Sequence, residues 1–369
     1  MVNFYANASW QHSNHCFLLS GNARLTGGNV GGNCMKKCLV SWIISAVLLI
    51  AASGCSPSVP TSQADRQTYS LGRNPFSTEI VAANGTVYYK SLALYNSGED
   101  GTLREYRYIG LSKKASASDT PDLIYDRFNF GLNVYKDTLY FIDTEYQLIQ
   151  YDSTTGEAGR FRQDNTKAVQ DALVINDALY FIEESDTQGE YQLKCYDLLT
   201  GEETMIAENI SWEQLNHYQE NVMVRSTDGT PQVYSAENHE LLEVGPFEDM
   251  EVLQILDNGK VIGYSKGTFY ECDLNGSQKR ELFSASQIYN VIITQDNIYY
   301  STVDEHAYTQ TFAYSFSENK TETINTTVYP IMGYSDSILY CSGTAGSGYL
   351  YSLDTRTGVE EVFDYRVTE

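Results

Sequence analysis

Acidic side chains close to tyrosines are the strongest candidates for binding residues in this chain. They recur where connections between short strands are expected: Asp143, Glu145, Glu183, Glu184, Asp304 and Glu305, with Tyr146 and Tyr191 close by. Carboxylates bind cations and basic groups, and aromatic side chains line binding sites. The group predicts a ligand-binding face for a basic peptide, a divalent cation or a glycan. The alternative is that exposed connections are simply polar.

One segment matches a hydrolase motif. Gly263–Gly267 reads Gly-Tyr-Ser-Lys-Gly, the G-x-S-x-G pattern whose serine is a nucleophile, and Asp304 and His306 could complete a triad. The motif needs a helix after the serine, whereas Thr268-Phe269-Tyr270 continues as a strand. We therefore expect a hairpin at Ser265 and predict no catalytic residue.

Metal and cofactor motifs are missing from the sequence. It contains no zinc-protease, EF-hand or P-loop pattern, and its cysteines and histidines lack metal-ligand spacing. We therefore expect no metal site and no cofactor. Cys195, Cys272 and Cys341 stand alone within strand-like runs, which indicates small buried side chains rather than disulfides.

The net charge of −24 limits the partners of the chain. Nucleic acid is excluded, because binding it requires clustered lysines and arginines that displace counterions. The excess acid is typical of a surface that keeps an exported protein in solution, or of a face for cations and basic partners.

The strands expected to carry these residues come from a sequence repeat. Leu139-Tyr140-Phe141-Ile142 is followed forty residues later by Leu179-Tyr180-Phe181-Ile182. Similar apolar segments, here called anchor runs, occur at intervals of 37 to 52 residues: Val87-Tyr88-Tyr89, Leu139-Tyr140-Phe141, Leu179-Tyr180-Phe181, Val222-Met223-Val224, Val261-Ile262-Gly263, Ile298-Tyr299-Tyr300 and Leu339-Tyr340-Cys341. A period near 40 with short strands matches one four-stranded blade of a β-propeller.

Turn residues support the same period. Asn or Asp stands before nearly every anchor run, as in Asn84-Gly85, and suits a tight hairpin. A second turn of the form Asp-x-x-Thr-Gly begins at Asp152, Asp197 and Asp354. We predict an all-β fold, a β-propeller of four-stranded antiparallel blades. About seven blades are expected, with six as the alternative because the first interval is long and the fourth run is weak.

The pattern of residues in the N-terminal region predicts an export signal. Met35-Lys36-Lys37 precedes an apolar run, residues 39–52, that is shorter than the roughly 20 residues of a membrane helix. The run ends in Ala52-Ser53-Gly54-Cys55, which resembles the lipobox of bacterial lipoproteins, with Ala52 where leucine is more common. The resemblance implies cleavage between Gly54 and Cys55 and attachment of lipid to Cys55, and two acyl chains suffice for stable anchoring. An ordinary secretory signal or a short uncleaved anchor is the alternative.

These observations divide the chain into four parts. Residues 1–34 are expected to be a mis-assigned start or a disordered extension, and 35–54 the lipoprotein signal peptide. Residues 55–76, which are rich in Ser, Thr and Pro, predict a flexible tether, and 77–369 the propeller. The expected location is the cell envelope, lipid-anchored and facing outside the cytoplasm, with the membrane as a partner through the anchor.

Two sets of residues carry a family resemblance. Tyr140-Phe141-Ile142-Asp143 and Tyr180-Phe181-Ile182-Glu183 resemble the Tyr-Trp-Thr-Asp repeats of low-density-lipoprotein-receptor-type propellers, with Phe in place of Trp. Phe269–Gly276 is similar to the Tyr-x-x-Asp-x-x-Gly strand ends of bacterial propeller lipoproteins whose domain has no assigned function. The resemblance covers the region after Phe76 and implies a propeller, but no single activity, because propellers host many functions.

The sequence favours a binding or scaffold module over an enzyme. With no convergent catalytic residues, we expect a membrane-anchored, extracytoplasmic and non-catalytic module for a protein, peptide or glycan ligand. The first alternative is an extracytoplasmic hydrolase or lyase that acts on glycan or peptide in the propeller funnel, where paired carboxylates would be required. The second alternative is an accessory subunit of an envelope complex or sensor.

Overall fold

The computed structural model describes most of the predicted propeller. The described residues are 68–69, 80–97, 103–162, 167–212, 215–247, 249–303, 309–325, 331–335, 338–342, 349–365 and 367–368. Their regular elements are all β-strands. None of these ranges contains a helix long and apolar enough to cross a membrane. The extension, the signal peptide, Gly54 and Cys55 lie outside the described residues, as does most of the tether.

The described strands form seven sheets, each with four consecutive antiparallel strands in chain order. We call these sheets blades 1 to 7 and their strands A to D, from first to last. Blades 1 to 3 contain β2 (Ile80–Ala83), β3 (Thr86–Ser97), β4 (Leu103–Lys114), β5 (Asp122–Tyr125), β6 (Phe128–Tyr135), β7 (Thr138–Asp143), β8 (Leu148–Asp152), β9 (Ala158–Arg160), β10 (Val169–Ile175), β11 (Ala178–Glu184), β12 (Tyr191–Asp197) and β13 (Glu203–Ile210).

Blades 4 to 7 repeat this plan to the end of the chain. They contain β14 (Asn216–Tyr218), β15 (Asn221–Arg225), β16 (Pro231–Tyr234), β17 (Leu241–Leu242), β18 (Glu251–Ile255), β19 (Lys260–Ser265), β20 (Thr268–Asp273), β21 (Arg280–Ser284), β22 (Ile288–Ile293), β23 (Asn297–Val303), β24 (Thr309–Ser315), β25 (Lys320–Asn325), β26 (Ile331–Ser335), β27 (Ile338–Ser342), β28 (Tyr349–Asp354) and β29 (Glu360–Tyr365). The predicted all-β propeller of four-stranded antiparallel blades is confirmed.

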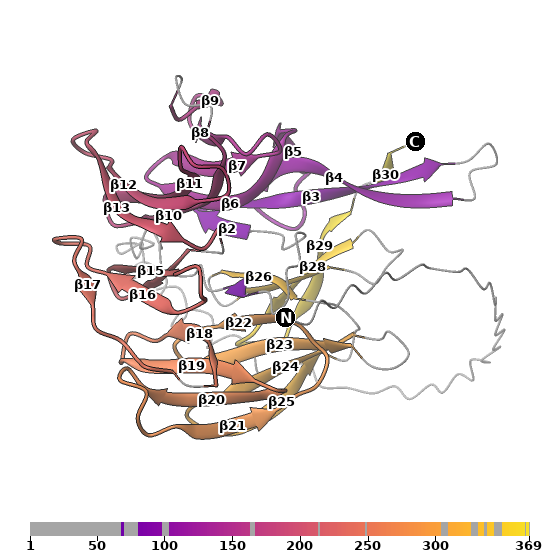
Figure 1. Ribbon diagram of the computed structural model, residues 1–369. Helices are drawn as coiled ribbons and strands as arrows, with labels where there is room; N and C mark the ends of the chain where they lie inside the picture. The colour runs from indigo at the N-terminus through magenta and orange to yellow at the C-terminus, as the bar shows by residue number, and fades with distance from the viewer. Residues whose placement is uncertain are drawn as a thin grey trace, which may run out of the picture. The chain divides into compact units, whose positions relative to one another are not determined.

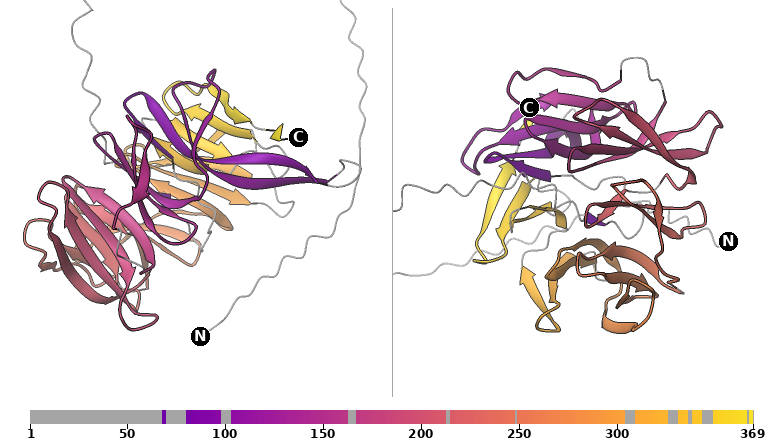
Figure 2. Two further views of the ribbon diagram at one scale, coloured as in Figure 1. Left: turned by 90° about the horizontal axis from the view of Figure 1, so that it is seen from above. Right: turned by 90° about the vertical axis from the view of Figure 1, so that its left-hand side faces the viewer.

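The blades follow one another around a common centre, which is visible when the left side of the molecule faces the viewer (Figure 2, right). Strand A is the inner strand of each blade. Neighbouring inner strands touch, as β6 does with β2 and β10, and β26 does with β2 and β22. Because consecutive hairpins point in opposite directions, the B–C connections and the crossings to the next blade lie at one end of the ring. We call that end the B–C face.

The anchor runs form the B strands, and those whose side chains the structure describes are buried on both sides. In β7, Leu139 and Phe141 join a cluster with Tyr88 and Leu111 of blade 1. The alternate residues, Tyr140 and Ile142, pack instead against Leu179 and Phe181 of blade 3. Because each B strand is sandwiched between two neighbours, it reads as a continuous apolar run and not as an alternating one.

The turns adopt the chemistry that the sequence predicts. Asn84 and Gly85 have φ values of 51° and 73° at the first hairpin. The Asp152 carboxylate accepts the backbone N–H groups of Thr154 and Thr155, at 2.8 and 3.0 Å, and Gly156 follows at φ 77°. These bonds satisfy the turn backbone and lower the pKa of Asp152, with the Thr154 side-chain bond as the largest cause.

The prediction that the isolated cysteines are buried and free of disulfides is confirmed for two of them. Cys195 and Cys272 are free and buried, and burial raises the pKa of the Cys195 thiol to about 11. A thiol with that pKa stays protonated at neutral pH and behaves as a small apolar side chain. The side chain of Cys341 lies outside the described residues.

Blade 1 meets blade 7 through side chains and a short strand. The Tyr89 hydroxyl donates to Asp364 at 2.7 Å, and the buried Lys114 ammonium donates to the backbone carbonyl of Phe363 at 2.5 Å. Strand β30 (Val367–Thr368) pairs in parallel with β3, whose hairpin with β4 extends beyond the other strands (Figure 1). These contacts join the two ends of the ring.

A short strand lies within the predicted tether. Strand β1 (Thr68–Tyr69) pairs antiparallel with Ile292 and Val291 of β22, and is the fifth strand of that sheet. Part of the segment that precedes residue 77 is therefore paired with the inner strand of blade 6.

Candidate functional site

A buried carboxylate organises the B–C connection of blade 2. Asp143 ends strand β7, and its side chain is 1% exposed. One carboxylate oxygen accepts the backbone N–H groups of Glu145 and Gln147, both at 2.9 Å. The backbone closes the same loop, because Tyr146 N donates to Asp143 O at 3.0 Å. Aspartate suits this position because its short side chain can accept hydrogen bonds from backbone N–H groups a few residues further along the chain, which fixes the turn.

Tyr146 is held in an unusual backbone conformation at this turn. Its φ is 60°, in the left-handed region that bulky residues avoid. Its carbonyl accepts the N–H of Val169 at the start of blade 3, and its ring meets the edge of Phe130 at 6.1 Å. The side chain is nevertheless 43% exposed. Positive φ also occurs at other turns of the chain, such as Lys136 and Lys266, so it marks Tyr146 as a turn position whose ring lies on the B–C face.

Arg127 approaches the turn from the connection that leads into blade 2. Its guanidinium contacts the Tyr125 hydroxyl at 3.1 Å and lies 3.8 Å from the Asp143 carboxylate. Its backbone carbonyl accepts the N–H of Thr144 at 2.8 Å. The hydrogen bond to Tyr125 is the largest cause of a raised Arg127 pKa. Burial, and then the negative charge of Asp143, raise the pKa of Tyr125, so this hydroxyl stays protonated.

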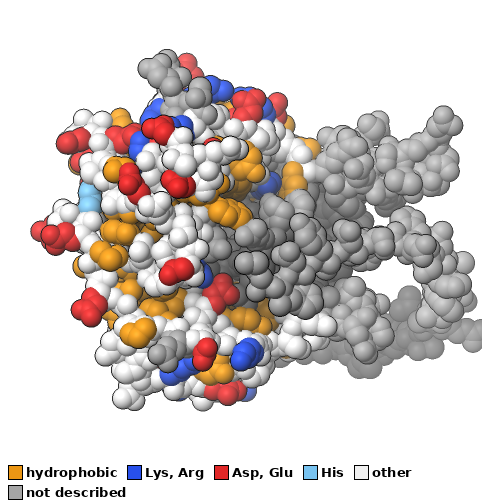
Figure 3. Space-filling view, viewed as in Figure 1, with side chains coloured by type: hydrophobic (Ala, Val, Ile, Leu, Met, Phe, Trp, Pro, Cys, Tyr) orange, Lys and Arg blue, Asp and Glu red, His pale blue; other side chains and the backbone are white. Residues whose placement is uncertain are grey.

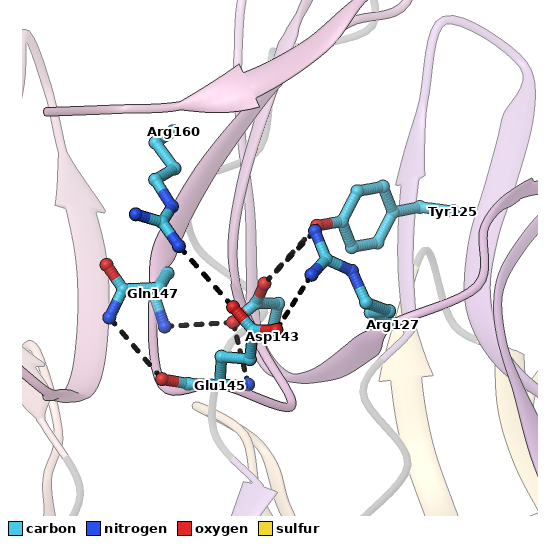
Figure 4. Close-up of polar contacts among 6 residues, drawn as sticks. All are labelled: Tyr125, Arg127, Asp143, Glu145, Gln147 and Arg160. Carbon is cyan, nitrogen blue, oxygen red and sulfur yellow. Dashed lines mark hydrogen bonds and ion pairs between the residues drawn. The ribbon is translucent and has the colours of Figure 1, made fainter. Parts of the chain in front are cut away.

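Glu145 is bound by two arginines that come from opposite sides of the turn (Figure 4). Arg127 Nη1 lies 3.0 Å from Glu145 Oε1, and Arg160 Nη2, at the end of β9, lies 3.4 Å from Oε2. The three side chains are about half exposed, at 49%, 47% and 54% for Arg127, Arg160 and Glu145. A carboxylate is thus held between two guanidinium groups at the surface.

Blade 3 carries a related but buried arrangement. Glu183 stands at the position of Asp143 in the repeat and is also 1% exposed. Arg162, from the connection into blade 3, contacts one oxygen, and Lys194 Nζ lies 2.6 Å from the other. Both cations also contact Glu203, each at 2.9 Å. Two acids and two bases therefore neutralise one another inside the blade.

The environment of Glu183 keeps it ionised. Burial alone would raise the pKa of its carboxyl, because desolvation disfavours the charged form. Hydrogen bonds from Lys194 and Arg162, together with their positive charges, outweigh burial and lower the pKa to about 2. Glu183 is consequently a structural anion whose two carboxylate oxygens are paired with Arg162 and Lys194.

The other predicted ligand-binding residues have different positions. Glu184 accepts the N–H of Gly189 at 3.3 Å in its own connection, and Tyr191 packs on the hydrophobic cluster of blades 3 and 4. Asp304 and Glu305 lie outside the described residues. Of the predicted set, the structure therefore brings Asp143, Glu145 and Tyr146 together in one turn.

Sequence reasoning missed the basic residues of this face. Arg127 and Arg160 compensate Asp143 and Glu145, so the connection is charge-balanced where an acidic rim was expected. Acidic side chains are scattered over the visible side of the propeller and not gathered in one field (Figure 3). The sequence did contain a signal for this charge balance. In blade 2 the B strand ends in an acid, Asp143, while one arginine stands just before the A strand and another ends the D strand.

The G-x-S-x-G segment has the predicted hairpin geometry. Ser265 pairs with Thr268 in the ladder between β19 and β20, and Lys266 and Gly267 form the two-residue turn with positive φ. The helix that a nucleophile elbow requires does not follow Ser265, because Thr268–Asp273 is a strand. Within the described part of the chain, no group of three or more His, Cys, Asp or Glu side chains could hold a metal ion.

Comparison with known proteins identifies similar folds but no family. No protein-family model matches the chain, and no curated protein matches it by sequence. The propeller domain of the Trilobed protease from Pyrococcus furiosus matches with a TM-score of 0.54 at 12% identity, over 82% of this chain and 97% of that domain. A puromycin-hydrolyzing peptidase of Mycobacterium tuberculosis matches with a TM-score of 0.57 at 8% identity, over 79% of this chain. An acylaminoacyl peptidase of Pyrococcus horikoshii matches with a TM-score of 0.54 at 12% identity, over 78% of this chain.

The expectation that the chain is no enzyme is wrong by this comparison. The solved structures that share its fold over most of its length include several peptidases. This chain spans about half the length of each of the peptidases from M. tuberculosis and P. horikoshii. At 8 to 13% identity, the likeness itself establishes the propeller fold.

Proposed function

We propose that the chain acts in the hydrolysis of extracytoplasmic peptides, and that its propeller binds the peptide. The observation that carries the proposal is the Asp143 turn, which presents Tyr146 and a Glu145 carboxylate between two arginines on one face. Such a surface offers apolar contact and both signs of charge, which are the groups needed to bind a peptide side chain and its polar backbone or ends.

The similarity of the fold to peptidases supports the same function. The matched structures include an acylaminoacyl peptidase and a prolyl endopeptidase, which also matches with a TM-score above 0.5. We infer that bond cleavage depends on groups beyond the blades that we describe. The propeller supplies the binding and orientation of the substrate, which lower the entropic part of the barrier.

The proposed location follows from the N-terminal sequence. We propose that Cys55 carries the lipid anchor of a bacterial lipoprotein and that the propeller faces outside the cytoplasm. The polar segment after Cys55 would hold the B–C face within reach of envelope peptides.

The test is a hydrolysis assay with a fluorogenic peptide library. The full chain, purified in detergent, is assayed alone and after addition to membranes from cells that lack it. We expect peptide cleavage that depends on the chain and that falls about tenfold in kcat/KM for Tyr146→Asn, which removes the ring but suits the backbone. Leu199→Ala, in an exposed C–D turn at the other end of the ring, is the control. No chain-dependent cleavage under either condition would rule out the proposal.

A further inference from the structure

Arg127 and Arg160 form an anion-binding pair whose present occupant belongs to the chain itself. The two guanidinium groups hold the Glu145 carboxylate through separate oxygens, at 3.0 and 3.4 Å. This is the arrangement in which arginines bind any carboxylate. We propose that the pair is the binding site for the terminal carboxylate of a peptide, and that Glu145 occupies it until the peptide displaces it. The inference rests on the proposed function and specifies which part of the peptide is bound.

Exposure makes the exchange feasible. All three side chains are about half exposed, and ion pairs at such positions are weak because water solvates both partners. A buried pair would be expensive to open, as Glu183 with Arg162 and Lys194 would be. The contrast between blades 2 and 3 therefore marks the Glu145 pair as the exchangeable one.

Arg127 remains positioned when Glu145 leaves. Its guanidinium keeps the Tyr125 hydroxyl at 3.1 Å and the buried Asp143 carboxylate at 3.8 Å. Asp143 is in turn fixed by two backbone N–H groups of its turn. One half of the anion site is thus organised in advance, which lowers the entropic cost of binding a ligand.

The neighbouring residue gives the site a side-chain preference. Tyr146 follows Glu145 in the same turn, and its exposed ring packs on the edge of Phe130. Aromatic pairs gain from edge-to-face and stacked contacts beyond the area they bury. We therefore expect a C-terminal residue with an apolar or aromatic side chain, bound through its carboxylate by the arginines.

The test compares two peptides that differ in one group. N-acetyl-Gly-Gly-Phe with a free carboxylate and the same peptide as its C-terminal amide are titrated into the full chain in detergent, by calorimetry. We expect the free acid to bind about threefold more tightly, because the weak pairs with two half-exposed arginines are lost in the amide. Higher salt should reduce that preference.

Four variants separate the site from general effects. Arg127→Gln and Arg160→Gln should bind both peptides equally. Glu145→Gln should bind the free acid more tightly than the wild type does, since the internal competitor is gone, and should bind the amide unchanged. Arg356→Gln is the matched control, because Arg356 is an exposed arginine paired with Asp354 at 3.2 Å in a C–D turn at the other end of the ring.

Several results would overturn the carboxylate site. These are no binding of the free acid, equal binding of both peptides to the wild type, a preference that survives both arginine substitutions, or weaker binding of the acid by Glu145→Gln. Cleavage of the fluorogenic library together with any of these results would overturn this site and leave the proposed function standing. Absence of both binding and cleavage would overturn both proposals.

Discussion

Arg162 reaches the Glu183 carboxylate from the connection that leads into blade 3, just as Arg127 reaches Asp143 from the connection into blade 2. Each pair joins a residue before the A strand to the last positions of the B strand of the same blade. The two blades use this shared contact differently. In blade 3 the acid is enclosed by two cations, and in blade 2 it organises an exposed turn.

Glu183→Gln should destabilise the propeller strongly. The substitution leaves Arg162 and Lys194 with one acid, Glu203, for two buried or half-buried cations. Breaking such a pair from one side costs about 3 kcal/mol in the free energy of unfolding. Chemical denaturation measures the change, and Lys320→Gln, which removes an exposed pair with Glu322, should cost less than about 1 kcal/mol. Equal costs for the two substitutions would contradict this account of the network.

The same network should make stability depend on pH in acid. Hydrogen bonds from Lys194 and Arg162 outweigh the effect of burial and lower the pKa of Glu183 from 4.5 to about 2. Because the folded-state pKa lies below the unfolded one, the contribution is complete above pH 4.5 and disappears as the pH falls toward 2. The difference in unfolding free energy between wild type and Glu183→Gln should therefore shrink across that range. A difference that stays constant from pH 5 to about 2 would argue against the lowered pKa.

Two glycines with similar backbones should respond differently to alanine. Gly85 has φ 73° and open space around an added Cβ, so Gly85→Ala carries the backbone cost alone, about 1 kcal/mol. Gly276 has φ 78°, and a Cβ there would lie 2.1 Å from the carbonyl oxygen of Pro246, so Gly276→Ala should cost about 3 kcal/mol. Thermal and denaturant unfolding of both variants measure the difference. A Gly276→Ala variant as stable as Gly85→Ala would show that the Pro246 segment yields easily.

Substitutions of Tyr146 should separate the effect of its backbone conformation on stability from the effect of its ring on peptide binding. Tyr146→Val places a β-branched residue at φ 60° and should lose about 1–2 kcal/mol of stability, whereas Tyr146→Asn suits this backbone and should stay within about 1 kcal/mol of the wild type. Both substitutions remove the ring and should weaken peptide binding alike. Denaturation together with calorimetry separates the two effects. If Tyr146→Asn bound peptide as tightly as the wild type, the Tyr146 ring would not be part of the binding site.

The predicted anchor can be tested by fractionation. The wild-type chain should sediment with membranes, and Cys55→Ser should appear in the soluble extracytoplasmic fraction, because the acyl chains provide the attachment. Metabolic labelling with a fatty acid should mark the wild type and not the variant. Labelling of Cys55→Ser, or its retention in membranes at the wild-type level, would contradict the assignment of Cys55.

The blade architecture was predictable because its signals are local in sequence. An Asn-Gly turn such as Asn84-Gly85 and an Asp-x-x-Thr-Gly turn such as that at Asp152 each act within a few residues. The anchor runs are apolar throughout because each B strand is covered on both sides. These features fix strand boundaries and the period without knowledge of any distant contact.

The charge balance of the site was not predictable in the same way. Arg127 and Glu145 are 18 residues apart, and Arg162 and Glu183 are 21 apart, so each pair forms only when the A and B strands of its blade have paired. The sequence-based prediction counted the acids of the connections and did not weigh the arginines that stand before the A strands and at the end of a D strand. It also placed Glu183 among exposed residues, because it did not consider that the end of a B strand can remain inside the sheet.

The interleaved packing of the B strands governs how this protein can vary. Leu139 packs against blade 1 and Tyr140 against blade 3, so a substitution at either position disturbs the packing of two sheets at once. Such positions therefore tolerate few changes. The turns at the ends of the blades are not packed between two sheets in this way. New ligand preferences can therefore arise by exchanging turn residues one blade at a time, while the ring that carries them stays constant.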